Sequence, residues 1–254
     1  MDKNERIMAI LGLLQKNQKV EVTDLAAKFQ TSDMTIRRDL NELAKQYNIR
    51  RTHGGAVLED QSVVRIVSFD ENRIPHRAEK EKIAERAAGM IRNGQRIFID
   101  AGSTTRIILD YLSQNIKAVV VTNHLEVAAH ALQFQNLSVI MLGGEMLRIT
   151  KCSSGPVAEE QLKKYRIDVA FIGAAAVGAD GRLYDGYSPE ARFKSSLFTV
   201  SKEVYVLADS SKINTYDLNE FGHLSNLAGL ITDSQINEEG RILMKRHSVQ
   251  LITV

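Results

Sequence analysis

The sequence predicts an α/β protein in two parts: a small helical N-terminal unit, followed by a larger unit with a doubly wound, mainly parallel sheet. The chain has 254 residues, which is more than one typical domain of about 100–150 residues needs. Up to about residue 58, densely charged segments have helical spacing, whereas from about residue 78 apolar strand-like runs alternate with helical ones. We therefore expect domains at 1–58 and 78–254, joined by a linker at 59–77 that has no sustained period.

Composition excludes several classes of protein. Hydrophobic residues make up 44% of the chain and charged residues 25%, which is ordinary globular usage. A single cysteine excludes a disulfide framework, and the histidines show no metal-ligand spacing, so we expect no metal and no cofactor. No apolar run resembles a signal peptide or a membrane span. We expect a cytoplasmic protein with no membrane partner, whose net charge of +2 does not by itself indicate nucleic acid.

Three helices are predicted in the first 47 residues. The first has apolar side chains at the i, i+3, i+4 and i+7 positions of one helical face, and these are Ile7, Ile10, Leu11 and Leu14. A strand-like segment at 19–22 follows. Thr23 is expected to cap the second helix and Ser32 the third, since each hydroxyl can accept from an amide of the first turn. The third helix is expected to bury Ile36, Leu40, Leu43 and Tyr47.

The second and third helices, joined by the short connection Gln30-Thr31, fit a helix-turn-helix. The outer face of the third helix carries Arg37 and Arg38. A guanidinium group can bond both guanine acceptors in the major groove or clamp a phosphate. The plain alternative is that both arginines solvate a surface helix and pair with Asp39 and Glu42.

Residues 49–57 are predicted to form a strand, a turn at Gly54-Gly55 and a second strand, with a basic tip. Such a hairpin is a wing, although the glycines would suit any hairpin and His53 could be a neutral surface histidine. The candidate DNA-binding residues are Ser32, Met34, Thr35, Arg37, Arg38, Asn41, Lys45, Arg51, His53 and Gly54.

These residues resemble a known family. The runs Asp24-Leu25-Ala26, TSDMTIRRDL at 31–40 and His53-Gly54-Gly55-Ala56 look like the signature of the DeoR family of bacterial transcription regulators. The resemblance implies a winged helix-turn-helix that binds double-stranded operator DNA and, in most members, represses genes for sugar uptake and catabolism. Two departures are Thr31, where the family usually has valine, and Asn48, where a glycine commonly opens the wing.

The second part of the chain repeats a strand-then-helix unit. Strands are expected at 96–100, 119–122, 138–142, 168–173, 203–209, 228–232 and 249–253. This alternation predicts a mainly parallel sheet covered on both faces, with any ligand outside the carboxyl ends of the strands.

The loop 101–105 is the strongest candidate for an anion site. It follows a buried strand ending at Asp100 and precedes an apolar helix through Leu112, so that loop amides, the positive helix end and three hydroxyls converge. The alternative is that Asp and Gly at strand ends are ordinary turn formers. Neither a P-loop nor a Gly-x-Gly-x-x-Gly motif is present, which disfavours nucleotides.

Other polar residues are expected at the same edge. Glu190 and Lys194 lie four apart on a helix starting at Pro189, where the alternative is a simple i,i+4 ion pair. Lys212 offers a further cation. The candidate effector-binding residues are Asp100, Gly102, Ser103, Thr104, Thr105, Thr122, Asn123, Gly143, Gly144, Glu190, Lys194, Asp209 and Lys212.

The runs at 100–105, 121–123, 143–144, 168–173 and 208–212, together with Glu190-Ala191 and Lys194, resemble the DeoR-family sensor domain, which is similar to ribose-5-phosphate isomerase. The resemblance implies a phosphorylated sugar as effector, with its phosphate at residues 102–105. One departure is Ile213-Asn214, where the family usually continues with Phe-Gly.

The expected function is a repressor of a carbohydrate operon whose operator binding is controlled by a phosphorylated sugar. Symmetric half-sites on DNA favour a homo-oligomer, either a dimer or a tetramer. The alternatives are a sugar-phosphate isomerase with Asp185 or Glu190 as base and Lys194 as electrostatic partner, and an activator or a regulator that answers to a partner protein. Cys152, beside Lys151, is a redox-sensor candidate only if its pKa is lowered.

Overall fold

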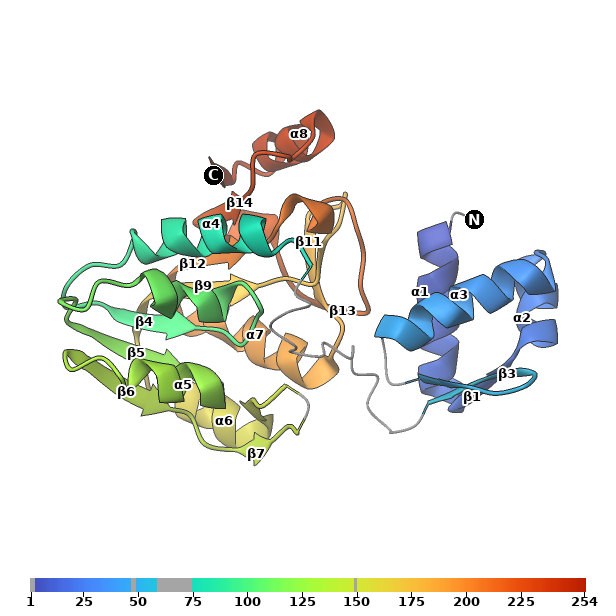
Figure 1. Cartoon of the computed structure of the whole chain (residues 1–254), viewed down its shortest axis with the longest axis horizontal. Helices are drawn as coiled ribbons and strands as arrows, with labels where there is room; N and C mark the ends of the chain where they lie inside the picture. The colour runs from blue at the N-terminus through green and yellow to red at the C-terminus, as the bar shows by residue number, and fades with distance from the viewer. Residues whose placement is uncertain (1–2, 47–48, 59–74, 149) are drawn as a thin grey trace.

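The computed structural model describes residues 3–46, 49–58, 75–148 and 150–254. Figure 1 shows a small unit formed by the described residues up to 58 and a larger α/β unit formed by those from 75 onward. Within the described ranges, no helix is long and apolar enough to span a membrane.

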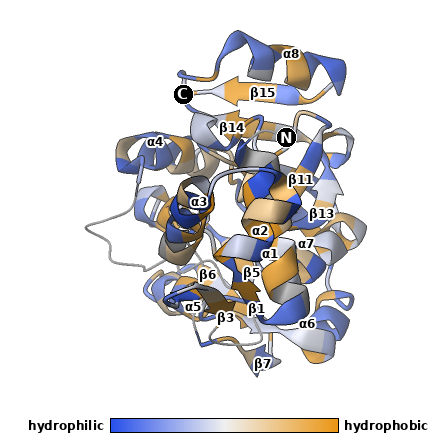
Figure 2. Cartoon of the chain, turned by 90° about the vertical axis from the view of Figure 1, so that its right-hand side faces the viewer, coloured by the Kyte–Doolittle hydropathy of each residue, from blue (hydrophilic) through white to orange (hydrophobic). Residues whose placement is uncertain are grey.

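The N-terminal unit packs three helices against a small sheet. Its elements are α1 (Lys3–Asn17), β1 (Lys19–Glu21), α2 (Val22–Phe29), α3 (Asp33–Gln46), β2 (Ile49–Arg51) and β3 (Gly55–Leu58). The sheet is antiparallel in the order β1-β3-β2. The predicted apolar stripes form its core, except for Tyr47, which lies outside the described residues. In Figure 2 these helices carry both hydrophilic and hydrophobic residues, as helices that bury one face must.

The two predicted helix caps differ in outcome. Ser32 caps α3 as expected, since its Oγ accepts from the amide of Thr35 over 3.2 Å. The expectation for Thr23 is wrong, because α2 begins one residue earlier, at Val22, and follows Glu21 without a side-chain cap. The strand β1 runs directly into α2, so no residue between them is left over to serve as a capping turn.

Close approach of two strands explains Gly55. A Cβ atom there would lie 1.9 Å from the carbonyl oxygen of Val20 on β1, a distance that no side chain can occupy. At Gly54 a Cβ would meet only the Glu21 carboxylate, at 2.8 Å. Neither glycine has a positive φ angle. Gly55 therefore serves the close packing of the wing, and neither glycine is needed for a left-handed turn.

The larger unit contains a seven-stranded parallel sheet in the order β15-β14-β12-β9-β4-β5-β6. Its strands are β4 (Arg96–Ile99), β5 (Ala118–Thr122), β6 (Leu137–Met141), β9 (Ile167–Gly173), β12 (Ser201–Leu207), β14 (Gly229–Thr232) and β15 (Gln250–Thr253). The doubly wound, mainly parallel sheet expected from the sequence is thus confirmed.

Helices cover both faces of this sheet (Figure 1). The helices are α4 (Arg77–Ala88), η2 (Thr105–Tyr111), α5 (Leu125–Ala131), α6 (Gly155–Leu162), α7 (Ser188–Val200), η3 (Ser210–Lys212), η4 (Leu224–Asn226) and α8 (Glu238–Arg246). Side chains of α4, η2 and α5 share one apolar cluster, and those of α6, α7 and α8 share the other. Alternation along β4 places Ile97 and Ile99 in the first cluster and Phe98 in the second.

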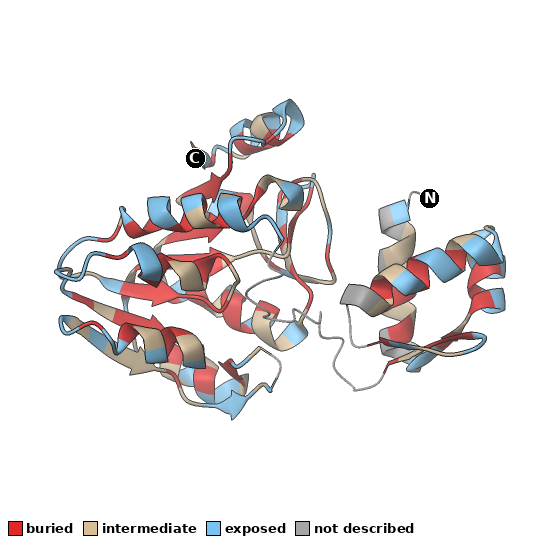
Figure 3. Ribbon diagram, viewed as in Figure 1, coloured by how far each residue is buried: buried red, intermediate tan, exposed pale blue. Residues whose placement is uncertain are grey.

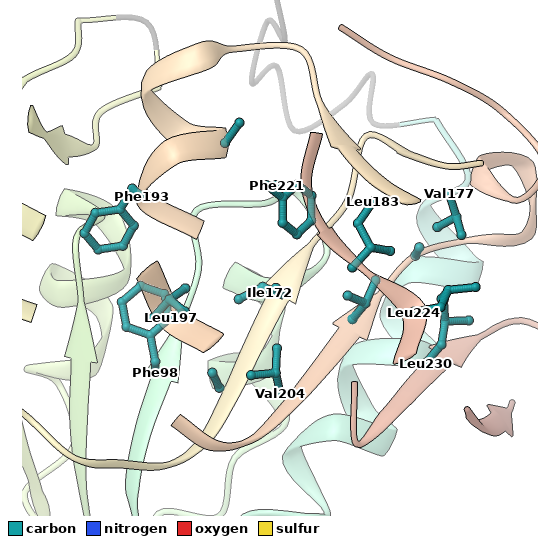
Figure 4. Close-up of a cluster of buried hydrophobic side chains, with 14 of the residues drawn as sticks. Phe98, Ile172, Val177, Leu183, Phe193, Leu197, Val204, Phe221, Leu224 and Leu230 are labelled. Carbon is teal, nitrogen blue, oxygen red and sulfur yellow. The ribbon is translucent and has the colours of Figure 1, made fainter. Parts of the chain in front are cut away.

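Two smaller sheets complete the unit. β10 (Ala176–Val177), β11 (Arg182–Asp185) and β13 (Asn219–His223) form an antiparallel sheet, and β7 (Glu145–Met146) pairs with β8 (Ser153–Ser154). The first of them closes the α7 side of the core, where Leu183 and Phe221 join Phe193 and Leu197 (Figure 4). Figure 3 shows the inner strands of the central sheet as largely buried, whereas the edge strands β6 and β15 contain no buried residue.

Candidate DNA-binding surface and effector site

The outer face of α3 is open to solvent, as predicted. Met34 is 62% exposed, and Arg37, Arg38 and Asn41 are exposed beside it. The hydroxyl of Thr35 is hydrogen-bonded to that of Ser32 over 2.9 Å, so these two residues form the start of the helix. Lys45 belongs to α3, but its side chain lies outside the described part of the structure.

The acidic neighbours of the two arginines are paired elsewhere. Asp39 accepts from Arg6 of α1 over 2.6 Å, and Glu42 pairs with Lys3 over 2.8 Å. Among the described residues, neither Arg37 nor Arg38 has an ion pair or a hydrogen bond. The alternative in which Asp39 and Glu42 neutralise them is therefore wrong, and both guanidinium groups remain available for a ligand.

The wing is tied to this face through Arg51. Its Nε donates to Oδ1 of Asn41 on α3 over 2.9 Å, and its Nη1 donates to the carbonyl of Gly55. Partial burial, and then the nearby charge of Arg37, hold the pKa of Arg51 below its usual value. His53 and Gly54 are exposed at the tip of the wing. Arg51 and Asn41 thus bond each other, an arrangement that the sequence did not indicate.

At the other site, the sheet brings the predicted polar residues to one edge. Asp100 follows β4, Asn123 follows β5, Gly143 follows β6 and Asp209 follows β12. These strands run parallel, and β9, ending at Gly173, lies between β12 and β4. The carboxyl edge therefore collects residues that are up to 109 positions apart in the chain, from Asp100 to Asp209.

Lys194 is the centre of a buried charge network. Its Nζ donates to Oδ2 of Asp185 over 2.7 Å and to the carbonyl of Gly173 over 2.9 Å, and lies 3.1 Å from Oδ2 of Asp100. Burial alone would lower the pKa of Lys194, but the carboxylates of Asp100 and Asp185 outweigh it and raise that pKa above its usual value. The simple i,i+4 ion pair with Glu190 is not formed, because the ammonium is directed to these other partners.

The loop after β4 is shaped by its own hydroxyl groups. Thr105 is fully buried, and its Oγ1 donates to the carbonyls of Asp100 and Gly102 over 2.7 and 3.0 Å. In contrast, the hydroxyls of Ser103 and Thr104 have no hydrogen-bond partner among the described residues. Two of the three hydroxyls are thus available for an anion.

One element of the anion argument needs correction. The apolar helix expected through Leu112 is present at Thr105–Tyr111, but it is a 3₁₀ helix, η2, and not an α-helix. A short 3₁₀ helix aligns few peptide dipoles. Any anion at this loop would therefore be held by loop amides and hydroxyls rather than by a helix end.

Residues after β5 and β6 support the same edge. Thr122 donates to the carbonyl of Ile99 over 2.8 Å, and Nδ2 of Asn123 donates to the carbonyl of Ser153 over 3.0 Å. Oδ1 of Asn123 is buried and lacks a hydrogen-bond partner among the described residues. The amide of Gly143 donates to Gln161 over 2.8 Å. A Cβ at Gly144 would lie 2.6 Å from the carbonyl oxygen of Ser154, which explains the glycine.

Glu190, in the first turn of α7, has a perturbed carboxyl group. Burial, together with the negative charge of Asp185, raises its pKa to about 7. Its Oε1 is buried and has no hydrogen-bond partner in the part of the chain that is described. Asp209 is also buried and accepts from the hydroxyl of Ser211, and Lys212 lies on the short helix η3.

Three residues at this edge were not among the effector-binding residues predicted from the sequence. Asp185, considered there only as the base of an enzyme, ends β11 of the smaller sheet, and the carbonyl of Gly173 binds Lys194. His124 is fully buried, and its Nδ1 accepts from the amide of Val127 over 3.3 Å. An acid at a strand end was the available signal for Asp185. For the other two, no sequence signal distinguishes them from ordinary residues.

Cys152 does not have the properties of a redox sensor. It is 1% exposed, and burial raises the pKa of its thiol well above the usual value. A reactive cysteine needs the opposite, an accessible thiol with a lowered pKa.

Taken together, a winged helix-turn-helix with two arginines exposed on its third helix and a parallel sheet with a polar ligand edge define a DNA-binding transcription regulator with a sensor domain. The comparisons with known proteins agree. A model of the DeoR-like helix-turn-helix domain matches residues 6–62, and a model of the DeoR C terminal sensor domain matches residues 75–234. The chain belongs to the DeoR family of transcription regulators, which distinguishes it from the isomerase alternative.

Its relatives span the whole chain. It is 30% identical to the glycerol-3-phosphate regulon repressor of Escherichia coli, over 99% of both chains. It is 32% identical to the lactose phosphotransferase system repressor of Streptococcus mutans, over 96% of this chain and 98% of the relative. The match to ribose 5-phosphate isomerase A of Methanocaldococcus jannaschii covers 53% of each chain at 21% identity, with a TM-score of 0.39, which is too low to carry an argument.

Proposed function

We propose that the protein is a repressor of a carbohydrate uptake or catabolism operon and that a phosphorylated sugar controls its hold on the operator. The named relatives that repress a glycerol-3-phosphate regulon and a lactose phosphotransferase system support the carbohydrate assignment. The observation that carries the DNA-binding part is that Arg37 and Arg38, on the exposed face of α3, have no ion pair or hydrogen bond with any residue that the structure describes.

In this proposal α3 enters the major groove of the operator. Arg37 and Arg38 bind guanine edges or phosphates, while Met34 and Thr35 approach base edges near the start of the helix. The wing adds backbone contacts through its tip. The proposed DNA-contacting set is Ser32, Met34, Thr35, Arg37, Arg38, Asn41, Lys45, Arg51, His53 and Gly54.

The proposed effector site lies at the carboxyl edge of the sheet. The phosphate binds the amides of the 102–105 loop and the hydroxyls of Ser103 and Thr104, which lack partners among the described residues. The polar groups around Asn123 and Glu190 then face the sugar. Asp100, Thr105, Thr122 and Lys194 act mainly by holding this edge in shape, since their polar groups are bonded to the protein itself.

Control requires the effector to bind one state of the protein more tightly than the other, because equal affinity for both shifts nothing. We propose domains at 1–58 and 78–254 with a linker at 59–77 between them. A homo-oligomer, a dimer or a tetramer, would present two winged helices to symmetric half-sites.

The experiment has two readouts on the same protein. Thermal shift is measured with a panel of phosphorylated sugars and their unphosphorylated counterparts. A ligand that binds only the folded protein, at about 100 times its Kd, raises the free energy of unfolding by about 2.7 kcal/mol. Binding to the upstream region of the chain's own operon is measured with and without each hit. The proposal expects a shift with one phosphorylated compound, a changed DNA affinity in its presence, and loss of both effects in Thr104→Val. A shift of equal size with the unphosphorylated sugar would contradict the phosphate loop.

A further inference from the structure

Glu190 differs from the other carboxyl groups at the carboxyl edge. Asp100 and Asp185 are each bonded to Lys194. Glu190 has no hydrogen bond or ion pair of its own among the described residues, and its Oε1 is a buried oxygen without a partner. The residue as a whole is only half-buried, so part of it can be reached from solvent. A carboxyl oxygen without a protein partner at a ligand edge is available to a ligand group.

Lys194 does not supply that match. Its Nζ donates to the carboxylate of Asp185 and to the carbonyl of Gly173 over 2.7 and 2.9 Å, and it forms an ion pair with the carboxylate of Asp100 at 3.1 Å. Among the described residues, no hydrogen bond or ion pair joins Lys194 to Glu190, although the two residues are one turn apart on α7.

The surroundings also favour the neutral form of this carboxyl group. Two carboxylates, Asp100 and Asp185, face it from β4 and β11, and Lys194 supplies a single positive charge. From the 150–153 segment, Thr150 and Cys152 approach it without reaching hydrogen-bond geometry. Burial and the charge of Asp185 raise the pKa of Glu190 to about 7, so that a large share of molecules carries a proton on it at neutral pH.

We propose that Glu190 recognises a hydroxyl group of the effector and does so as a neutral carboxylic acid. The proposal rests on the proposed function, a phosphorylated effector at this edge. It adds the chemical class of the effector, which is a phosphorylated polyol or sugar with free hydroxyls, in preference to a phosphorylated sugar acid. A second anionic group on the ligand would meet the carboxyl groups of Asp100, Asp185 and Glu190, while the Lys194 ammonium is already ion-paired with Asp100 and Asp185, and like charges at such distances repel.

The class is tested with named probes on the full-length protein. Methyl phosphate reports the phosphate loop alone. Glycerol 3-phosphate and fructose 6-phosphate add hydroxyls, and 3-phosphoglycerate and 6-phosphogluconate add a carboxylate. We expect at least one hydroxyl-bearing probe to bind at least tenfold more tightly than methyl phosphate, and the acids to bind no better than methyl phosphate. Tighter binding of the acids, or equal binding of methyl phosphate and both hydroxyl probes, overturns the proposal. If no phosphorylated probe binds, the phosphate effector of the proposed function fails, and this proposal with it.

The protonation state is tested with Glu190→Gln, whose amide has the shape of the neutral acid and cannot ionise. The tightest hydroxyl-bearing probe is titrated between pH 7.5 and 9, where its phosphate, with a second pKa of about 6, is fully ionised. In the wild type the affinity should fall by up to about tenfold per pH unit, because binding requires the proton on Glu190. In Glu190→Gln the affinity should stay flat with pH.

The other groups that face Glu190 do not produce this slope. Burial lowers the pKa of His124, so the imidazole is already neutral above pH 7.5, and its Nδ1 is an acceptor. The pKa values of Cys152 and Lys194 lie above their usual values, so neither ionisation changes in the window. Glu160→Gln, an exposed change on α6, is the matched control and should keep the wild-type slope. A flat wild-type profile, or the same slope in Glu190→Gln, overturns the proposal.

Discussion

The Nε atom of Arg6 donates to Oδ2 of Asp39 over 2.6 Å, and the Asp39 side chain is only 3% exposed. This largely buried pair joins α1 to α3. It also removes Asp39 from the reach of Arg38, its neighbour in the sequence. One buried ion pair therefore both fastens the third helix and leaves its arginines free.

Breaking this pair should destabilise the N-terminal unit. Asp39→Ala leaves the Arg6 charge with its main partner missing, and removing one member of a buried pair costs about 3–5 kcal/mol. Urea unfolding of the wild type and the variant measures the difference. Glu42→Ala, which removes the exposed partner of Lys3, is the control and should cost less than about 1 kcal/mol. Equal effects of the two changes would contradict the structural role of Asp39.

Arg38→Ala should weaken operator binding and leave stability unchanged. The side chain is exposed and has no partner among the described residues, so its loss breaks no internal contact. If Arg38 contacts a base, its loss should weaken DNA binding by about 1–3 kcal/mol. If it contacts a phosphate, the slope of log affinity against log salt concentration should fall by about 1. Fluorescence anisotropy at several salt concentrations distinguishes the two. Lys82→Ala, an exposed change on α4, serves as control, and unchanged affinity in Arg38→Ala would remove this residue from the DNA face.

The two wing glycines should respond differently to alanine. At Gly55 the added Cβ would lie 1.9 Å from the backbone of Val20, so β1 and β3 cannot keep their pairing. At Gly54 only the mobile end of Glu21 must give way. Thermal unfolding should show a clear loss in Gly55→Ala and little change in Gly54→Ala. Similar melting temperatures for both variants would argue against the close approach of β1 to β3.

Lys194→Met should abolish the effector response without removing DNA binding by the N-terminal unit. The change leaves the buried carboxylates of Asp100 and Asp185 without their shared cation, which costs about 3–5 kcal/mol. Because the pKa of Lys194 is raised, its contribution to stability is fully present below the pKa of the unfolded chain and is lost only as the pH rises through the folded value. Lys194 itself therefore stays charged between pH 6 and 9, and urea unfolding of both proteins at pH 6 measures the cost of removing it.

Glu190 should make the protein less stable as the pH rises. Its folded pKa of about 7 lies above the unfolded value near 4.5, so the folded state holds the proton more tightly, and stability falls between these two values. Relative to Glu190→Gln, the free energy of unfolding of the wild type should fall by about 2 kcal/mol between pH 5.5 and 8. This figure is an upper bound, because the residue is only half-buried. Urea unfolding at both pH values measures it. A difference independent of pH would show that the carboxyl group titrates normally.

Local patterns predicted the elements because they depend on local physics. The apolar spacing of α1 and α3 and the cap at Ser32 follow from helix geometry alone. The alternation of strands and helices predicted a parallel sheet with its ligand edge at the carboxyl ends. The predicted cap at Thr23 was wrong, because strand β1 runs straight into α2. The helix predicted through Leu112 is present, but the chain after the loop winds into the 3₁₀ helix Thr105–Tyr111.

The sequence by itself determined the two units, the basic outer face of α3 and the polar residues after each strand, since period and composition are properties of neighbouring residues. Only the tertiary structure decided the partners. Asp39 belongs to Arg6 and not to Arg38, and Lys194 belongs to Asp100 and Asp185 and not to Glu190. Coulomb attraction and hydrogen bonding act through space, so ionic partners depend on which helices and strand ends the fold brings together. That choice leaves Arg37 and Arg38 open on one surface and Glu190 unmatched at the other site.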